Sequence, residues 1–141
     1  MPLKLSLKPG EKFVLNGAVV QNGDRRSALL LQNKASVLRE KDIMQVDEAV
    51  SPARRIYFPV MMMYLDQVEG QSFHDEFIQR LSEFMGAVSN PDILTDCVNI
   101  SRHVMIKEYY KALMLCRKLI EYEDERLGNV APRLSAGGAA G

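Results

Sequence analysis

The sequence has little of what catalysis or metal binding requires. Among its 141 residues it contains no tryptophan, two histidines and two cysteines. His74 and His103 have no Cys or His partner at metal-ligand spacing, so a structural metal site is not expected. The glycine-rich phosphate-binding loop, the dinucleotide-binding turn and the serine-hydrolase motif do not occur in the sequence either. We therefore expect a protein that is not an enzyme and that has no metal or cofactor.

Long apolar runs are missing too. The sequence has no stretch of about 18 apolar residues, the length that a membrane-spanning helix needs. The first residues alternate polar and apolar side chains, unlike the apolar core of a signal peptide. Cys97 and Cys116 fall within helix-like apolar patterns, which favours reduced, buried thiols. These features predict a cytoplasmic protein with no membrane contact.

The charges cancel over the whole chain but are unevenly placed along it. Eighteen Lys and Arg balance eighteen Asp and Glu. Residues 1–55 hold ten basic and six acidic side chains, whereas residues 56–127 hold seven basic and twelve acidic ones. A mildly basic first part and an acidic second part indicate a division of labour between the two.

The first 45 residues have the pattern of short antiparallel strands. Leu3, Leu5 and Leu7 alternate with polar side chains, so one face of this segment is apolar. Asn-Gly is the strongest short hairpin signal, because both residues accept positive φ. We expect four or five strands, in a sheet that curls into a partly open barrel or packs on other elements. The dipeptides that mark turns are Pro9-Gly10, Asn16-Gly17, Asn22-Gly23 and Asn33-Lys34.

The segment 52–66 is ambiguous. It is mostly apolar but contains Pro59, which would remove one helical hydrogen bond. A kinked helix and an edge strand are both open. We favour the kinked helix, because Ser51 and Pro52 resemble an N-cap followed by proline at the first helical position.

The remaining patterns are helical. Ser72 and Asp75 resemble a capping box, and Asn90-Pro91 resembles another helix start. Residues 101–126 have the pattern of the longest helix, with an apolar arc broad enough to need cover on more than one side. The whole therefore predicts an α+β fold. A small N-terminal antiparallel β-sheet or partly open barrel occupies residues 1–48, a C-terminal helical bundle follows over 49–128, and residues 129–141 form a flexible tail.

Basic residues of the first part form the one candidate surface for nucleic acid. Cations on a small sheet can hold phosphates and contact the edges of unpaired bases, as recognition of single-stranded RNA requires. Asp24, Glu40 and Asp42 lie among them and dilute the charge, so an ordinary solvated face is the alternative. The predicted RNA-binding residues are Lys8, Arg25, Arg26, Arg39, Lys41, Arg54 and Arg55, and Lys34 belongs to the same basic group.

Apolar helical residues are the candidates for protein contacts. The run Met61–Met63 can form an adaptable surface because unbranched thioethers repack easily, although burial in a core is the commoner outcome. The predicted partner-binding residues are Met61, Met62, Tyr109 and Leu113.

Three segments together resemble a known family. They are LKLSLKPGEKFVLNGAVV at the start, SVLREKDIM at the end of the predicted sheet, and SPARRIYFPVMMMYLD in the middle. Their order and spacing resemble the FlbT family, the flagellin-synthesis regulators of flagellated alphaproteobacteria, up to about residue 127. The resemblance implies a post-transcriptional repressor that acts on the 5′ untranslated region of flagellin mRNA, inhibits translation and promotes message decay. It also implies coupling to FlaF, a small helical protein with an opposing effect.

A second resemblance covers the sheet alone. KPGEKFVLN and VLREKDI are similar to the opening and closing strands of the CsrA family, small RNA-binding proteins that dimerise by interleaving strands. The position of a family arginine that contacts RNA is occupied by Arg39. Where that family has consecutive basic residues before the Gly-Glu turn, this chain has Leu7 and Lys8, so only one charge is kept. This resemblance leaves a homodimer open.

Two functions thus stand side by side. In the first, the sheet contacts flagellin mRNA through its cations and the helices recruit a protein partner. In the second, the protein is an adaptor that binds FlaF or flagellin through its apolar helices and affects the mRNA indirectly.

Overall fold

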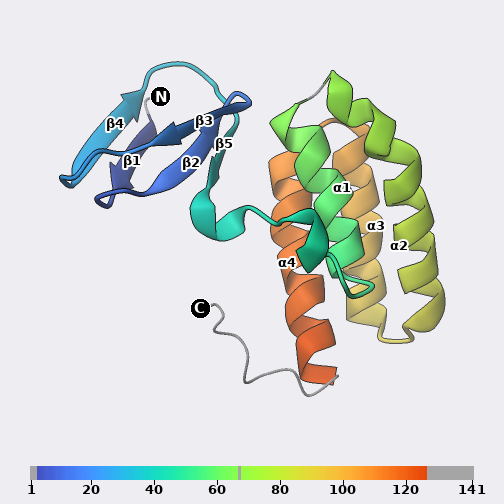
Figure 1. Ribbon diagram of the computed structural model, residues 1–141. Coiled ribbons are helices and arrows are strands. Elements are labelled where there is room, and N and C mark those ends of the chain that lie inside the picture. The colour runs from blue at the N-terminus through green and yellow to red at the C-terminus, as the bar shows by residue number, and fades with distance from the viewer. Residues whose placement is uncertain (1–2, 67, 127–141) are drawn as a thin grey trace.

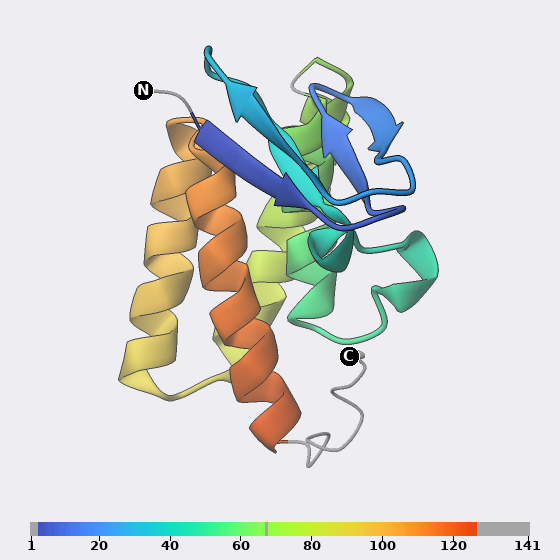
Figure 2. The same ribbon diagram turned by 90° about the vertical axis from the view of Figure 1, so that its left-hand side faces the viewer.

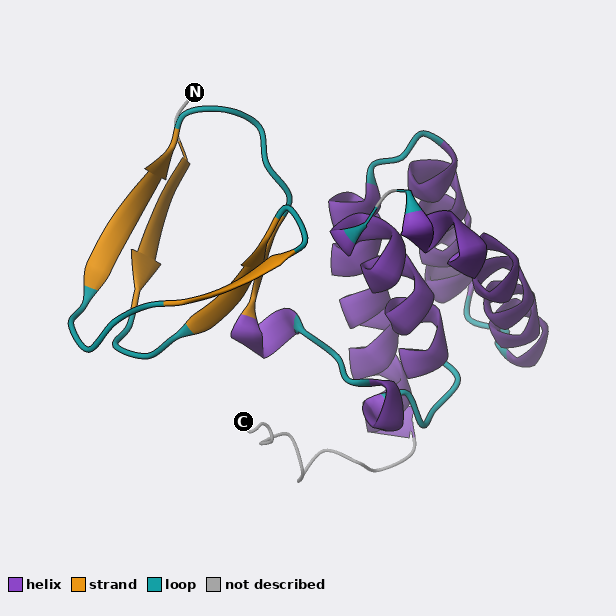
Figure 3. Ribbon diagram, turned by 45° about the horizontal axis from the view of Figure 1, so that its top comes forward, coloured by secondary structure: helices purple, strands orange, loops and turns teal. Residues whose placement is uncertain are grey.

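The computed structural model describes residues 3–66 and 68–126, and in these ranges five short strands precede four α-helices (Figure 1). This is the α+β arrangement that the sequence predicts. The strands lie together as one unit, and the helices pack side by side as a second one (Figure 3). No helix among the described residues is both long and apolar enough to cross a membrane. The predicted tail lies outside the described residues.

The strand module, residues 3–39, contains two small antiparallel sheets. Strand β1 (Leu3–Leu7) pairs with β4 (Ser27–Leu31), and the second sheet has the order β3-β2-β5. Its members are β2 (Lys12–Leu15), β3 (Ala18–Gln21) and β5 (Val37–Arg39). No ladder joins the two sheets within the described residues. They enclose a core of three buried side chains, namely Leu5, Leu7 and Phe13.

The two Asn-Gly pairs behave differently. Asn16 and Gly17 have φ of 49° and 85° and form the two-residue turn between β2 and β3, as predicted. The prediction of a hairpin at Asn22-Gly23 is wrong, because β4 pairs with β1 rather than with β3. The Asn22 amide instead donates hydrogen bonds to the carbonyl oxygens of Lys8, at 2.8 Å, and Arg25, at 2.9 Å. One local and one long-range hydrogen bond of this side chain thus replace the hairpin turn.

Two short 3₁₀ helices, η1 (Glu40–Asp42) and η2 (Val46–Glu48), connect the module to helix α1 (Arg54–Leu65). Residues 54–65, including Pro59, are helical, so the helix and not the edge strand is correct. The start lies two residues beyond the predicted proline: Ser51 and Pro52 form a turn, and the Ser51 hydroxyl accepts a hydrogen bond from the Arg54 N–H at 3.4 Å.

Helix α2 (His74–Ala87) follows the 3₁₀ helix η3 (Glu69–Phe73) without a break. The predicted capping box is therefore wrong. The Ser72 hydroxyl donates to the Glu69 carbonyl, and no side chain caps the first turn of α2. The Asn90 prediction is confirmed, because its side chain accepts hydrogen bonds from the Asp92 and Ile93 N–H groups at the start of α3 (Pro91–Met105).

The predicted single helix 101–126 is interrupted. Residues 101–105 complete α3, the chain reverses at 106–108, and α4 (Tyr109–Arg126) runs back along it. Lys107 takes φ of 63°, and the Glu108 N–H donates to the His103 carbonyl at 2.8 Å, which closes the end of α3. The sequence has no glycine or proline here to mark the break.

Helix α4 packs against both α1 and α3, so its broad apolar arc is covered on two sides as predicted. Cys97 and Cys116 are free and buried in this core. Burial raises the pKa of the Cys97 thiol to about 11, so the protonated form predominates at neutral pH. Strand residues Val14 and Leu38 also belong to this core, which fastens the strand module to the helical bundle, residues 54–66 and 68–126.

Candidate functional site

Three exposed cations gather where the β1–β4 ribbon ends. The ladder pairs Leu7 with Ser27, so Lys8 and Arg26 follow side by side beyond it. The Asn22 amide joins the carbonyl oxygens of Lys8 and Arg25, which brings the third cation to the same end. No carboxylate in residues 3–66 and 68–126 forms an ion pair with any of them. We call Lys8, Arg25 and Arg26 the basic cluster.

Arg39 lies beside the basic cluster, but its guanidinium is already engaged. It donates to both carboxylate oxygens of Glu11, with Nη2 to Oε2 at 2.8 Å, and to the Ser6 carbonyl at 2.6 Å. The Lys8 N–H donates to the same carboxylate at 2.9 Å. The hydrogen bond from Lys8, followed by those from Arg39, lowers the pKa of Glu11. Arg39 therefore bridges the two sheets, and Glu11 neutralises its charge.

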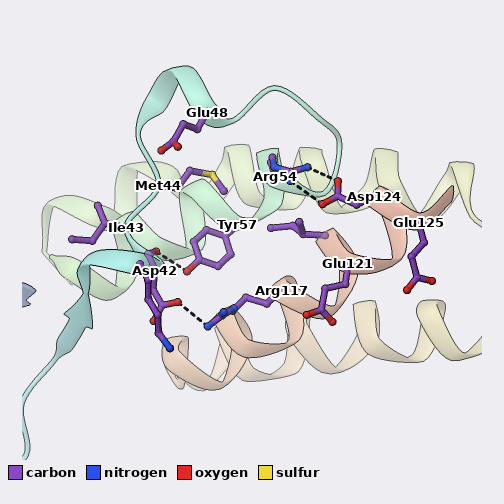
Figure 4. A pocket seen from close by; sticks show the side chains of 12 residues that line it. Asp42, Ile43, Met44, Glu48, Arg54, Tyr57, Arg117, Glu121, Asp124 and Glu125 are labelled. Atoms are coloured by element: carbon purple, nitrogen blue, oxygen red, sulfur yellow. Dashed lines mark hydrogen bonds and ion pairs between the residues drawn. The ribbon is translucent and has the colours of Figure 1, made fainter. Parts of the chain in front are cut away.

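Lys41 and Arg54 belong to a different place, a cleft of about 550 Å³ between η1, α1 and α4 (Figure 4). Arg54 donates to the two oxygens of Asp124 at 2.9 and 3.0 Å and approaches Glu123 at 3.6 Å. The hydrogen bond with Asp124 raises the pKa of Arg54. On the opposite wall Arg117 pairs with Asp42 at 2.7 Å. Figure 4 shows both guanidinium groups directed at their carboxylates.

Carboxylates outnumber cations in this cleft. Its lining contains three basic side chains and five acidic ones, so its field does not favour a phosphate. Ala53 donates its N–H to the buried Glu123 carboxylate at 2.9 Å, and the Tyr57 hydroxyl donates to the Asp42 carbonyl at 2.8 Å. These hydrogen bonds hold the connecting segment against the bundle. Arg55, the neighbour of Arg54 on α1, is exposed and is not among the cleft residues.

The predicted partner-binding residues lie in the interior of the bundle. Met61, Tyr109 and Leu113 are buried, and Met62 is half-buried against the same core. They stabilise the packing of α1 and α4, and three of the four present almost no surface in this conformation.

Two tyrosines that sequence reasoning missed fasten α1 to the chain that precedes it, one to the strand module and one to η1. The Tyr64 hydroxyl accepts from the Val37 N–H at 2.8 Å and donates to the Val37 carbonyl at 2.9 Å. It thus satisfies both backbone groups of this β5 residue, as a neighbouring strand would. The Tyr57 hydroxyl donates to the carbonyl of Asp42, the last residue of η1. The spacing of seven residues on one helix is the signal that places both hydroxyls on one face.

Comparisons with known proteins give one consistent result. The family described as "Flagellar protein FlbT" matches residues 3–127. The "Flagellum biosynthesis repressor protein FlbT" of Caulobacter vibrioides strain CB 15 is 74% identical over 141 residues, which are 100% of both chains.

Two further relatives are each named "Probable flagellum biosynthesis repressor protein FlbT". The protein of Caulobacter sp. strain K31 is 76% identical over 131 residues, 93% of this chain and 100% of its own. That of Rhodopseudomonas palustris strain CGA009 is 38% identical over 127 residues, 90% of this chain and 98% of its own. No solved structure matches the chain. The family match and the full-length relatives establish that the chain belongs to the FlbT family.

Proposed function

We propose that this protein is a cytoplasmic post-transcriptional repressor of flagellin synthesis. It associates with the 5′ untranslated region of flagellin mRNA, inhibits translation and promotes decay of the message. Its relatives carry the name of flagellum biosynthesis repressors, which supports repression in flagellar regulation. The contact with RNA and the coupling to FlaF follow from the resemblance of the three sequence segments to FlbT.

The basic cluster is the observation that carries the RNA contact. Lys8, Arg25 and Arg26 are exposed, adjacent and without ion-pair partners among the described residues. Such cations bind phosphates by displacing counterions, and a chain of zero net charge can do so when its cations are grouped locally. Arg39 and Arg54 are held by carboxylates, so we assign the direct contacts to the cluster and a supporting role to Arg39.

The mechanism requires no chemical step. A protein bound to the leader, the 5′ untranslated region of the message, excludes the ribosome by occupying the same nucleotides. Message that is not being translated is then open to cellular nucleases. FlaF would oppose repression by binding the protein and lowering its occupancy on the leader.

Binding of a flagellin leader RNA over a series of salt concentrations tests the proposal. Replacing Lys8, Arg25 and Arg26 with Ala should weaken binding and reduce the slope of log affinity against log salt by about 0.7 for each lost phosphate contact. The titration is run with and without purified FlaF. A matched variant replaces Arg102, Lys118 and Arg126, three exposed cations of α3 and α4, with Ala.

The matched variant should bind the leader like the wild type. An unchanged salt slope in the cluster variant would exclude the basic cluster as the phosphate contact. Absence of leader binding by the wild type, both alone and with FlaF, would contradict direct association with the message.

The adaptor hypothesis, in which FlaF or flagellin binds through the helices, is weaker in its original form. Three of its four named residues are in the core, where a partner cannot reach them without rearrangement of the bundle. We therefore do not propose that Met61, Met62, Tyr109 and Leu113 form the binding surface.

A further inference from the structure

A second groove, of about 720 Å³, lies where the strand module meets the α3–α4 turn. Figure 2 shows the start of β1 beside the end of the bundle at which α3 ends and α4 begins. Leu3 and Leu5 of β1 form one wall, and residues 107–111 form the opposite one. Val37 and Tyr64 also line this space. We call this space the lysine groove, because Lys34, Lys107 and Lys111 line it.

Apolar side chains are unusually exposed in and beside this groove. Leu3 is 52% exposed and Tyr110 is 44% exposed, although both line it. On the adjoining turn, Met105 is 75% and Ile106 is 61% exposed. Leu3 and Tyr110 share one groove, and exposed apolar side chains grouped in this way typically mark interaction surfaces.

The turn that follows Met105 and includes Ile106 is held in one conformation by hydrogen bonds. Lys107 lies in the left-handed region at φ of 63°, which residues other than glycine seldom adopt. Hydrogen bonds from the Lys107 N–H to the Val104 carbonyl, at 3.0 Å, and from Glu108 to His103 hold it there. A strained conformation that the surrounding bonds maintain is often found at functional sites. Here this conformation fixes the backbone next to Met105 and Ile106 before a partner binds, which reduces the entropy lost on binding.

The charge of the groove selects the occupant. Lys34, Lys107 and Lys111 line it, and the one carboxylate among the lining residues is Glu108. That carboxylate is engaged by His103 at 3.2 Å and by Lys111 at 3.4 Å, and these hydrogen bonds lower its pKa. The groove therefore combines apolar and aromatic side chains with a net positive charge. Residues 127–141 contain no Asp or Glu, so they do not supply a matching segment.

We propose that the lysine groove binds an acidic polypeptide segment of a partner protein. Apolar side chains of that segment pack on Leu3, Met105 and Ile106, while its carboxylates pair with Lys34 and Lys107. RNA is less favoured here, because the exposed side chains in and beside the groove include the aliphatic Leu3 and Ile106, and the Tyr110 ring already packs against Tyr64 at 5.6 Å. This inference is independent of the proposed RNA contact, which lies at the other end of β1.

Fluorescence polarisation with the full-length protein tests this inference. The probe is a short fluorescein-labelled peptide of Glu, Asp, Leu and Phe, compared with a peptide in which Lys replaces every acidic residue. The double variant K34E/K107E reverses the charge of two of the three lysines that line the groove. The matched variant K4E/R102E makes the same change in charge at exposed cations outside the groove. Circular dichroism verifies that both variants are folded.

The acidic peptide should bind the wild type and K4E/R102E, and bind K34E/K107E about tenfold more weakly or worse. Leader RNA should bind K34E/K107E as it binds K4E/R102E. Equal binding of the acidic and lysine peptides would overturn the proposal. So would no peptide binding, a loss of leader RNA binding confined to K34E/K107E, or a dimer in the wild type that dissociates only in that variant. Failure of leader binding by the wild type would contradict the proposed function and leave this inference standing.

Discussion

The strand module and the helical bundle are stabilised in different ways. The bundle has a core of twenty buried side chains, including Val14 and Leu38 from the strands, whereas the module encloses three. So small a core contributes little to stability, since short two- and three-stranded sheets depend on packing against other elements. Polar contacts compensate in the module: Glu11 holds Arg39, Tyr64 holds Val37, and Asn22 joins Lys8 to Arg25. These contacts hold together a module on which Lys8, Arg25 and Arg26 are exposed.

Strand β2 shows how the two regions share support. Phe13 points into the core of the module and Val14 into that of the bundle, because successive side chains of a strand face opposite sides. The β1–β4 ribbon has no such second attachment, and Ser27 to Leu30 are all exposed. The basic cluster thus lies at the end of a ribbon that contributes no side chain to the bundle core. Local opening should begin there.

The largest expected effect tests whether the module opens separately. Phe13→Ala removes the largest side chain of the small core, which is 1% exposed, at a cost of about 3–5 kcal/mol. Because β1 and β4 contribute nothing to the bundle core, their amides should lose protection from hydrogen exchange while those of α3 and α4 keep it. Hydrogen-exchange mass spectrometry measures both.

Leu113→Ala is the matched variant in the bundle, where the side chain is fully buried. It should cost about 2–5 kcal/mol and reduce protection in both regions, because the module packs on the bundle. Equal loss of protection everywhere in Phe13→Ala would show that the two regions unfold as one unit.

The second prediction concerns the turn between α1 and α2. A Cβ added at Gly70 would lie 2.6 Å from the Met62 carbonyl oxygen and from the Met63 Cα, both backbone atoms that cannot rotate away. Gly70→Ala should therefore destabilise the bundle by about 1–3 kcal/mol through overpacking. Urea denaturation followed by circular dichroism measures the change.

Gly86→Ala is its control. Gly86 lies in α2, and an added Cβ there meets no atom within 4 Å. This substitution should raise stability by about 0.5–1 kcal/mol, since alanine is the better helix former. Destabilisation by both substitutions would contradict the close approach at Gly70.

Local features of this fold can be predicted from the sequence, and contacts between distant segments cannot. Asn16-Gly17 and Asn90 act through their own backbone conformation and their nearest neighbours, and both predictions are confirmed. The reversal at Lys107 has no breaking residue, so it depends on α3 packing against α4. The hairpin predicted at Asn22-Gly23 is wrong because the Asn22 amide donates to the carbonyl of Lys8, 14 positions earlier, a contact that the local sequence does not indicate.

The candidate site shows the same limit. The sequence shows which residues are basic but not which of them are already paired. Arg39 meets Glu11, 28 positions earlier, and Arg54 meets Asp124, 70 positions later. Neither separation leaves a periodic signal, because the partners lie on different elements. The lysine groove likewise combines residues from β1, β5, α1 and the α3–α4 turn.

The third prediction tests the connection between the two regions. Tyr64→Phe removes the hydroxyl that bonds both the N–H and the carbonyl of Val37, and should cost about 1–2 kcal/mol. The loss should appear as faster hydrogen exchange in β5 and β2. Tyr110→Phe is the matched change, because the structure gives that hydroxyl no hydrogen bond among the described residues. A similar effect of both substitutions would contradict the role of Tyr64.

The smallest effect, and the one that depends on pH, concerns the bridge between the sheets. The pKa of Glu11 is lowered in the folded protein, first by the Lys8 N–H and then by Arg39, so the ionised carboxylate favours folding. This contribution is complete above the unfolded pKa near 4.5 and disappears as the pH falls through the lower folded pKa. Glu11→Gln should therefore cost about 0.5–1 kcal/mol at pH 7, reduced by salt because the pair is partly exposed. The difference between wild type and variant should shrink towards zero on acidification, as urea denaturation at several pH values measures. A difference for Glu11→Gln that stays constant down to low pH would mean that packing rather than charge joins the two sheets.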